Sequence, residues 1–321
     1  MAGRLTSAGD DISVVQKLDA DSFDDTDFVF FVGTAQDTLR FWRPAQQAGA
    51  AIIDLTGALE SEPAVLVRAP WVLAASTAPA RDDSPQLDLS TPAVVAAHPA
   101  TMMLLAAANQ LNGKLAVRSI AATLFEPASA HGQAAMDELH QQTVSLLSFQ
   151  PIPRAQFDAQ IAFNLLPVLG EAASIDLDVT RARVAREYAA LTGSVAPELA
   201  LQVVQAPVFH ASALSAFIEL GEPATVAQVE TALRGGPIDV PGAGSDPPTN
   251  VNAAGQARII ASVSAAMPLA PPSPEAFSTS GARASTRFWL WMTADNLKLA
   301  ALNAIACAGE LGRLRPRGKV Q

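Results

Sequence analysis

The sequence predicts two domains, an α/β domain followed by a mixed α+β domain. Its 321 residues exceed the roughly 100–200 residues of a usual domain. In the first third, two unbroken apolar runs flank a helical stretch, which is the pattern of a parallel α/β unit. Beyond residue 100, strand-like runs and helical stretches are mixed in order, which is typical of an α+β domain.

The parallel unit begins with the apolar run 27–33, which ends in glycine, and continues to a second run at 50–54. The stretch 36–48 between them permits a helix. Such units bind ligands at the carboxyl ends of their strands. The residues there are small or carry hydroxyl groups and would let a ligand approach the backbone: Gly33, Thr34, Thr56 and Gly57. The alternative is that both segments are ordinary turns.

The later elements follow from local patterns. Proline and threonine at the start of an apolar stretch predict a helix over 100–111. Strand-like runs are expected at 115–124, 199–209 and 216–220, and helices at 133–148 and 179–192. Glycine and proline mark 235–252 as a loop and 268–285 as a linker.

The last helix has clear signals at both ends. Asp295 is the expected N-cap, small and apolar residues recur on one face, and Gly312 lies near the end. Cys307, the only cysteine, lies on this helix and is expected to pack as a small buried thiol. A single cysteine excludes an internal disulfide and a cysteine-built zinc site.

The charge balance argues against polyanionic partners. The chain carries 21 Lys and Arg against 31 Asp and Glu, a net charge of −10 without long charged blocks. It therefore lacks the basic footprint that nucleic acids or anionic membranes require. The sequence shows no N-terminal signal pattern and no uninterrupted apolar run of roughly 18 residues. We expect a soluble cytoplasmic protein with no nucleic-acid or membrane partner.

The beginning of the chain has no glycine-rich turn. A dinucleotide-binding domain opens with a strand, such a turn, and a helix whose N-terminus holds the pyrophosphate. Residues 1–11 are polar, and their two glycines follow no predicted strand. We expect a domain that has lost its first βα element, or a start codon placed too far downstream.

Several segments, taken in chain order, resemble aspartate-semialdehyde dehydrogenases. Three of them are I-A-F-N-L-L-P at 161–167, P-V-F at 207–209 and D-N-L-K-L-A-A-L-N-A at 295–304. In addition, T-L-F-E-P-A-S-A-H-G at 123–132 and the helical residues that follow it are similar to that family's Y-Q-A-V-S-G-A-G segment. The resemblance runs from residue 12 to residue 314.

The resemblance implies both a fold and a reaction. It implies a truncated Rossmann-like nucleotide-binding domain over 1–99, completed by a C-terminal helix over 286–321, and a mixed α+β substrate and dimerisation domain over 100–285. In that family a cysteine thiolate attacks an aldehyde, hydride passes to NADP, and phosphate releases an acyl phosphate. The resemblance thus implies a homodimer, NADP as the cofactor if one binds, and Asn296 as a further nucleotide-binding candidate.

The catalytic positions of that family carry other residues in this chain. The N-P-N-C motif falls on 98–101, which places Thr101 where the nucleophile would be. A hydroxyl there needs a strong adjacent base, and its ester is a poorer acyl donor than a thioester. Glu126 replaces the glutamine of Y-Q-A, Gln205 replaces the arginine that would hold a substrate carboxylate, and Ser212 replaces the general-base histidine.

Histidines could have rebuilt the site. His210 precedes Ser212 by two residues, which in a strand keeps both side chains on one face. We expect three further residues to share a cleft with His210: His98, Glu126 and His131. Such a set could be structural or solvent-facing, act as acid and base, or bind a divalent metal, although its spacing matches no established ligand motif. His140, on the polar face of helix 133–148, is expected at the surface.

Three functions remain open from the sequence. The preferred one is a catalytically degenerate family member, a homodimer that binds a small molecule or regulates a partner. The second is an active NADP-dependent semialdehyde oxidoreductase with an unusual site. The third is a metal-assisted hydrolase in the former pocket.

Overall fold

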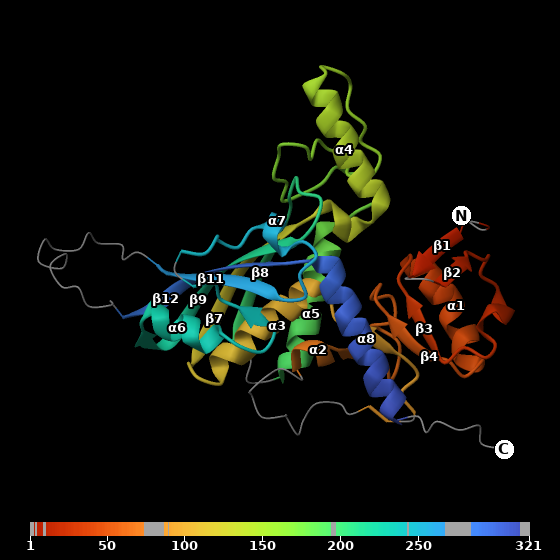
Figure 1. Cartoon of the computed structure of the whole chain (residues 1–321), viewed down its shortest axis with the longest axis horizontal. Coiled ribbons are helices and arrows are strands. Elements are labelled where there is room, and N and C mark those ends of the chain that lie inside the picture. The colour runs from red at the N-terminus through yellow and green to blue at the C-terminus, as the bar shows by residue number, and fades with distance from the viewer. Residues whose placement is uncertain are drawn as a thin grey trace, which may run out of the picture. The chain divides into compact units, whose positions relative to one another are not determined.

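The computed structural model describes residues 3, 5–8, 11–73, 87–88, 90–193, 197–242, 244–266 and 284–314 (Figure 1). The chain divides into two compact units. The first comprises Met1–Leu66, Leu87–Val95 and Ala308–Gln321, and the second comprises Val67–Gln86 and Ala96–Cys307. A parallel sheet and a larger mixed sheet are present, which confirms the predicted combination of α/β and α+β architecture.

The first unit contains the predicted βαβ arrangement. Strands β3 (Phe28–Phe31) and β4 (Ala51–Asp54) are parallel, and α1 (Ala35–Gln47) connects them. The Thr34 side chain caps α1 by accepting a hydrogen bond from the Asp37 backbone N–H. Strand β6 (Val94–Ala96) pairs in parallel with β4, and the four-stranded sheet, which includes β5 (Leu66–Arg68), has the order β3-β4-β6-β5.

The N-terminal segment differs from the sequence-based expectation. Instead of having no strand, it forms an antiparallel hairpin of β1 (Leu5–Ala8) and β2 (Asp11–Val14), followed by the 3-10 helix η1 (Ala20–Phe23). The large apolar side chains of Leu5, Ile12 and Val14 are exposed. Because the hairpin buries none of these side chains, the sequence lacks the clear in-out alternation from which strands are predicted.

The second unit is built on a six-stranded sheet with the order β10-β11-β12-β9-β7-β8. Strand β7 lies between β8, to which it is parallel, and β9, to which it is antiparallel. The strands are β7 (Val117–Glu126), β8 (Glu198–Gln205), β9 (Ser212–Ala224), β10 (Ile238–Asp239), β11 (Ile259–Ala265) and β12 (Ser285–Ala294).

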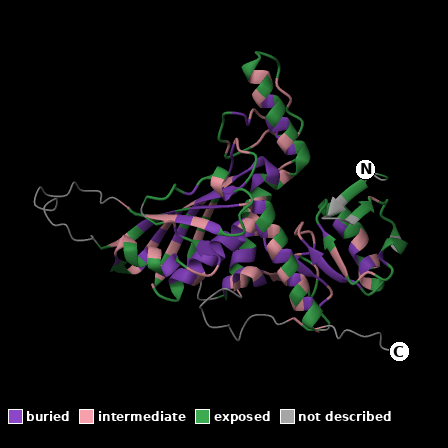
Figure 2. Ribbon diagram, in the orientation of Figure 1, coloured by how far each residue is buried: buried purple, intermediate pink, exposed green. Residues whose placement is uncertain are grey.

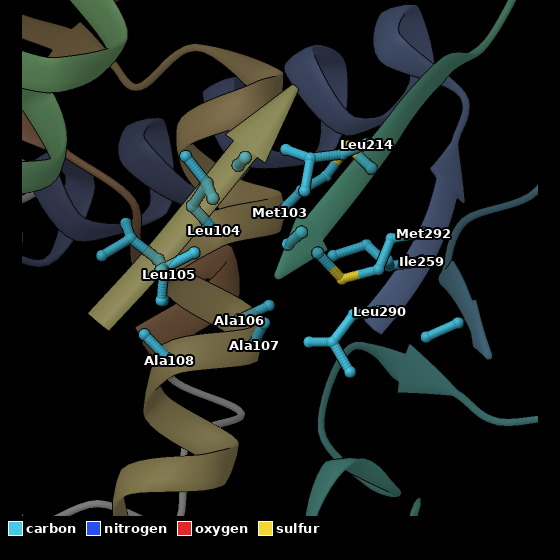
Figure 3. Close-up of a cluster of buried hydrophobic side chains, with 14 of the residues drawn as sticks. Met103, Leu104, Leu105, Ala106, Ala107, Ala108, Leu214, Ile259, Leu290 and Met292 are labelled. Atoms are coloured by element: carbon cyan, nitrogen blue, oxygen red, sulfur yellow. The ribbon is translucent and has the colours of Figure 1, made fainter. Parts of the chain in front are cut away.

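Helices cover one face of this sheet. Three of the helices that pack on its strands are α3 (Pro99–Asn112), α5 (Leu177–Thr192) and α6 (Val226–Leu233). Figure 3 shows Met103 of α3 near Leu214 of β9, with Leu290 and Met292 of β12 in the same cluster. Nearly every residue of α3 is buried, which is why its sequence is apolar all round rather than on one stripe.

A helical arm follows strand β7. It consists of the 3-10 helix η2 (Ala128–His131) and α4 (Gln133–Leu147), and it carries a small separate core with Phe157 and Ile161. Figure 1 shows α4 extending away from the six-stranded sheet, and in Figure 2 the part of α4 farthest from the sheet is mostly exposed. The predicted helix over 133–148 is therefore confirmed, although it does not cover the sheet.

The C-terminal part corrects two expectations. Residues 286–294 are not part of a C-terminal helix, because Ser285–Ala294 form β12 in the middle of the six-stranded sheet. Helix α8 (Asn296–Leu314) begins after them, with Asp295 accepting the Lys298 N–H as predicted for an N-cap. The linker expected at 268–285 lies outside the described residues up to residue 283.

The structure also bears on two smaller expectations, for the loop at 235–252 and for Cys307. The loop expected at 235–252 contains the short strand β10 and the start of α7 (Asn250–Ala253). Cys307 is buried on α8, which confirms its packing role. No helix among the described residues is long and apolar enough to cross a membrane.

Candidate functional site

The N-terminus of α3 holds the predicted nucleophile position. His98 is the N-cap, Pro99 occupies the first turn, and Thr101 is completely buried. The Thr101 hydroxyl donates to Oε2 of Glu187 at 2.6 Å, and the His98 backbone N–H donates to the same oxygen at 2.7 Å. The Glu187 carboxylate of α5 therefore occupies the N-terminus of α3, a position that favours an anion.

The Glu187 carboxylate is itself held by Arg183, one turn earlier on α5. The Arg183 Nε lies 2.8 Å from Oε1 of Glu187, and the guanidinium also donates to the Ala96 carbonyl oxygen. Burial raises the pKa of the Glu187 carboxyl, while Arg183 and the Thr101 and His98 hydrogen bonds oppose that rise. Both oxygens of the carboxylate thus accept hydrogen bonds, and the group belongs to a closed internal network.

A second cluster lies at the end of strand β7. Glu126, the last residue of β7, has a buried carboxylate whose oxygens lie 3.7 Å from Nε2 of His98 and 3.4 Å from Nε2 of His131. Gln205, at the end of β8, lies 3.1 Å from the same His131 nitrogen through its Oε1. Four residues from three parts of the chain therefore meet around one carboxylate.

The hydrogen bonds assign the proton positions in this cluster. The Gln205 amide nitrogen donates to the Glu126 and Ala206 carbonyl oxygens, so its Oε1 is the atom that faces His131 and must accept. His131 therefore carries a proton on Nε2. His98 accepts the Ala100 N–H at Nδ1, so neutral His98 carries its proton on Nε2, toward Glu126.

Burial dominates the titration of both groups. It lowers the pKa of His98 to about 4, with the Arg183 charge acting in the same direction and Glu126 opposing. Burial alone would raise the pKa of Glu126, but the interactions with His131 and His98 outweigh it and lower the pKa. At neutral pH the cluster is therefore a carboxylate facing a neutral His98.

The structure brings together only part of the predicted site. Glu126 lies beside His98 and His131, as expected, and Gln205 also contacts His131, whereas Thr101 is engaged with Glu187. Ser212 is buried as the first residue of β9, paired with Ala294 of β12. The exposed His140 lies at the surface as predicted.

His210 does not share the burial of Ser212. Its side chain is exposed, and in the described part of the chain no hydrogen bond or ion pair joins it to the other histidines or to Glu126. The rule that alternate residues share a face fails because β9 starts only at Ser212 and because Ala211 has a φ of 66°, outside the extended region. The structure also shows no group of three or more His, Cys, Asp or Glu side chains arranged to hold a metal, as far as its described residues go.

Comparisons with known proteins agree with this architecture. The dimerisation domain of semialdehyde dehydrogenases matches residues 108–260. A USG-1 protein homolog of Pseudomonas aeruginosa is 33% identical over 299 residues, covering 91% of this chain and 81% of that protein. The chain belongs to the aspartate-semialdehyde dehydrogenase family.

Other family members extend the comparison. The aspartate-semialdehyde dehydrogenase of Rickettsia bellii is 26% identical over 315 residues, covering 96% of this chain and 86% of that enzyme. The structure of a probable aspartate-semialdehyde dehydrogenase from Pseudomonas aeruginosa superposes with a TM-score of 0.76 at 28% identity, over 97% of this chain and 86% of that one. Aspartate semialdehyde dehydrogenase II from Vibrio cholerae shares the fold, with a TM-score of 0.77 at 22% identity and coverage of 97% and 87%.

The dehydrogenase family implies NADP, and the first unit can be tested for its fit. Two of the predicted residues, Thr34 and Thr56, are linked through Thr38, whose hydroxyl donates to the Thr34 carbonyl oxygen and lies 3.1 Å from the Thr56 hydroxyl. However, the Thr34 hydroxyl donates to the Asp37 carboxylate at 2.7 Å, so a negative charge already sits at the N-terminus of α1. A pyrophosphate would be repelled from that position.

The other nucleotide-binding candidates are also engaged. Gly57, with a φ of 78°, lies in the turn after β4, where the buried Asp54 accepts the Thr56 and Leu59 N–H groups. Gly33 is the residue that precedes Thr34, the N-cap of α1. In the second unit, the buried Asn296 accepts the Ser129 hydroxyl. The described residues at these positions do not fit a dinucleotide phosphate.

Sequence reasoning missed Arg183 and Glu187. The helix over 179–192 is correct, but nothing in its local pattern indicates that this pair points inward rather than to solvent. An i,i+4 pair of opposite charge is usually an exposed feature. Here Glu187 is buried. The signal in the sequence is that Arg183 and Glu187 immediately precede Val184 and Tyr188, which have the same four-residue spacing and are also buried.

Lowering the pH is expected to destabilise the fold through His98. Its folded-state pKa is about 4, whereas the unfolded chain titrates near 6.5. Between these values only the unfolded state takes up the proton, so this contribution is complete above the unfolded pKa and is lost as the pH falls toward the folded one. We expect His98 to account for about 2 kcal/mol of lost stability between pH 8 and pH 5 in urea unfolding experiments.

Two variants separate this contribution from the rest. His98→Gln should flatten the profile between pH 8 and pH 5, while His140→Gln, at an exposed position, should leave it unchanged. An identical pH profile in His98→Gln and the unsubstituted protein would show that His98 is not the buried neutral group described above.

Proposed function

We propose that this protein is a catalytically degenerate aspartate-semialdehyde dehydrogenase, a cytoplasmic homodimer that binds a small ligand or regulates a partner instead of oxidising a semialdehyde. The observation that carries the proposal is the hydrogen bond from Thr101 to Glu187. The residue at the nucleophile position is fully buried, so a substrate carbonyl cannot reach its oxygen. Covalent catalysis requires that contact.

The substitutions at the family's other catalytic positions also support a degenerate site. Gln205 supplies no positive charge for a substrate carboxylate, and its amide is already bonded to two backbone carbonyl groups. Ser212 provides no general base. The first unit supports the same view, because Asp37 sits where a nucleotide phosphate would approach.

A second candidate is favoured by one distance. The 2.6 Å contact between Thr101 and Glu187 has the geometry of a hydroxyl nucleophile and its base. In that case the protein would be an oxidoreductase with an oxyester intermediate. The proposal of a degenerate site is preferred because Glu187 also serves the His98 N–H and Arg183, and because a base so occupied holds the hydroxyl rather than activating it.

An activity assay decides between the two. Purified protein with aspartate semialdehyde, phosphate and NADP should produce no NADPH above the enzyme-free blank, while an active dehydrogenase serves as positive control. A turnover number within the usual range of about 1–1000 per second contradicts the proposal. If turnover is found, its loss in Thr101→Val identifies the oxyester route, since Thr101→Val replaces the hydroxyl with a methyl group and keeps the shape of the side chain.

The open face of the six-stranded sheet is suited to a dimer contact. Along β12 the side chains of Phe288, Leu290 and Met292 point to the helices, so Trp289 and Trp291 point the other way and remain 46% and 36% exposed. Trp289 packs edge-on against Phe217 of the neighbouring strand β9, and Trp291 lies tilted against Phe125 of β7, with ring centroids 5.1 Å and 5.8 Å apart. Large exposed aromatic side chains are enriched at protein interfaces.

The dimer prediction concerns Trp289. Light scattering after size exclusion should give twice the 33.3 kDa chain mass for the unsubstituted protein, and one chain mass for Trp289→Glu, because a charge would be buried at the contact. Phe149→Glu, at a fully exposed aromatic position beyond α4, is the matched control and should remain dimeric. A dimeric Trp289→Glu variant would place the contact elsewhere.

A further inference from the structure

The Glu126 cluster consists of Glu126, His98, His131 and Gln205. Its one charged group at neutral pH is a carboxylate, whereas a site that binds carboxylates carries positive charge. The Glu126 side chain is 2% exposed, and its Oε2 accepts no hydrogen bond from the part of the chain that the structure describes. An unsatisfied buried carboxylate oxygen is costly, so its retention points to a role outside packing. The atom that is left without a partner is an acceptor.

Most hydrogen-bond donors around Glu126 already have acceptors within the protein. His131 donates its Nε2 proton to Gln205 at 3.1 Å and is 3.4 Å from Glu126. His98 presents its Nε2 proton toward Glu126 from 3.7 Å, which is too long for a hydrogen bond. The Gln205 amide protons are taken by carbonyl groups. An anionic ligand would therefore find one free donor among these four side chains, the His98 Nε2–H, and that N–H points at the negatively charged Glu126 carboxylate.

The Arg183 charge, which acts on His98, is also committed. Arg183 bonds Glu187 and the Ala96 carbonyl oxygen, so it cannot turn toward a ligand without leaving Glu187 unpaired. A carboxylate entering the cluster would face the Glu126 charge in a poorly solvated place, whereas a protonated amine would supply the donor that Oε2 lacks. The rings of His98 and His131 are 16% and 12% exposed, so the carboxylate lies behind two rings that reach solvent.

We propose that the Glu126 cluster binds a ligand through a protonated amine or similar N–H donor group and rejects carboxylates. The inference rests on the proposed function, because it treats the cluster as a binding site and not as a catalytic one. The substitutions of Gln by Glu126 and of Arg by Gln205, relative to the family's motifs, both shift the cluster toward negative charge.

Histidine NMR signals provide a direct test. The chain has four histidines, of which His98 and His131 flank Glu126 while His140 and His210 are exposed and serve as internal controls. The probes are n-propylamine and propionate, which match in size and differ in charge. We expect propylamine to shift the His98 and His131 ring signals in a saturable way, and propionate to leave them in place, at up to about 10 mM, which would fill a millimolar site.

Variants identify the carboxylate responsible. Glu126→Gln should weaken propylamine binding at least tenfold, a change of about 1.4 kcal/mol. Glu222→Gln, at an exposed carboxylate in β9, should bind as the unsubstituted protein does. Glu126→Gln combined with Gln205→Arg should reverse the preference toward propionate. If Glu126→Gln does not fold, the comparison of the two probes on the unsubstituted protein still decides the proposal.

The proposal is overturned if propionate shifts His98 and His131 as strongly as propylamine, if neither probe shifts them, or if Glu126→Gln binds propylamine unchanged. These results are separate from the activity assay. Turnover of aspartate semialdehyde would overturn the proposed function, whatever the charge preference of the cluster.

Discussion

Glu187→Ala is expected to lower the free energy of unfolding by about 3–5 kcal/mol, because it leaves a buried charge without its partner. The Arg183 guanidinium, one helical turn away on α5, would lose the carboxylate 2.8 Å from its Nε. The Thr101 hydroxyl and the His98 backbone N–H, both directed at the same carboxylate, would lose their acceptor. Urea unfolding followed by circular dichroism measures the change.

The same helix supplies a matched control. Asp178 forms an ion pair with Arg181 at 3.0 Å, but both side chains are at least half exposed. Asp178→Ala should therefore cost less than about 1 kcal/mol. Adding Arg183→Ala to Glu187→Ala should recover part of the loss, since the guanidinium that has lost the Glu187 carboxylate is removed. Equal losses in Glu187→Ala and Asp178→Ala would mean that Glu187 does not hold the α3 N-terminus.

Gln142→Ala should destabilise the helical arm by about 2–5 kcal/mol, because four buried or half-buried backbone groups lose their partners at once. The Gln142 side chain is fully buried on α4. Its amide nitrogen donates to the Pro153 and Ala159 carbonyl oxygens, and its Oε1 accepts the Ile161 and Ala162 N–H groups. One side chain thus fastens the segment after α4 to the helix.

The neighbouring residue provides the control for Gln142. Gln141→Ala removes the same chemical group from an exposed position on α4 and should change stability by less than about 0.5 kcal/mol. Hydrogen exchange gives a second readout, because the Ile161 and Ala162 amides should lose protection in Gln142→Ala alone. Unchanged protection of these amides would show that other contacts hold the segment.

Local patterns in the sequence determined the elements that are most regular. The two apolar runs became β3 and β4, and the helices expected at 100–111, 133–148 and 179–192 are α3, α4 and α5. The family resemblance also followed from short segments in order. Each of these depends on residues close together in the chain, whose periodicity and capping reflect their own burial.

Two predictions, for β12 and for His210, differ from the structure because the local sequence pattern there is misleading. The sequence pattern predicts a linker and part of the last helix where β12 lies, although Phe288, Leu290 and Met292 alternate with Trp289 and Trp291. Both sets are large and apolar, so no polar face marks the alternation. The two-residue rule predicts that His210 and Ser212 share a face, but the positive φ of Ala211 breaks that rule.

The sequence by itself determined which residues stand at the family's catalytic positions, and above all that Thr101 replaces the cysteine. Only the tertiary structure decided what surrounds them. It brought Glu187 to Thr101 from 86 residues away and grouped Glu126 with two histidines and Gln205. Contacts over such distances depend on how sheets and helices pack together, which no local spacing specifies.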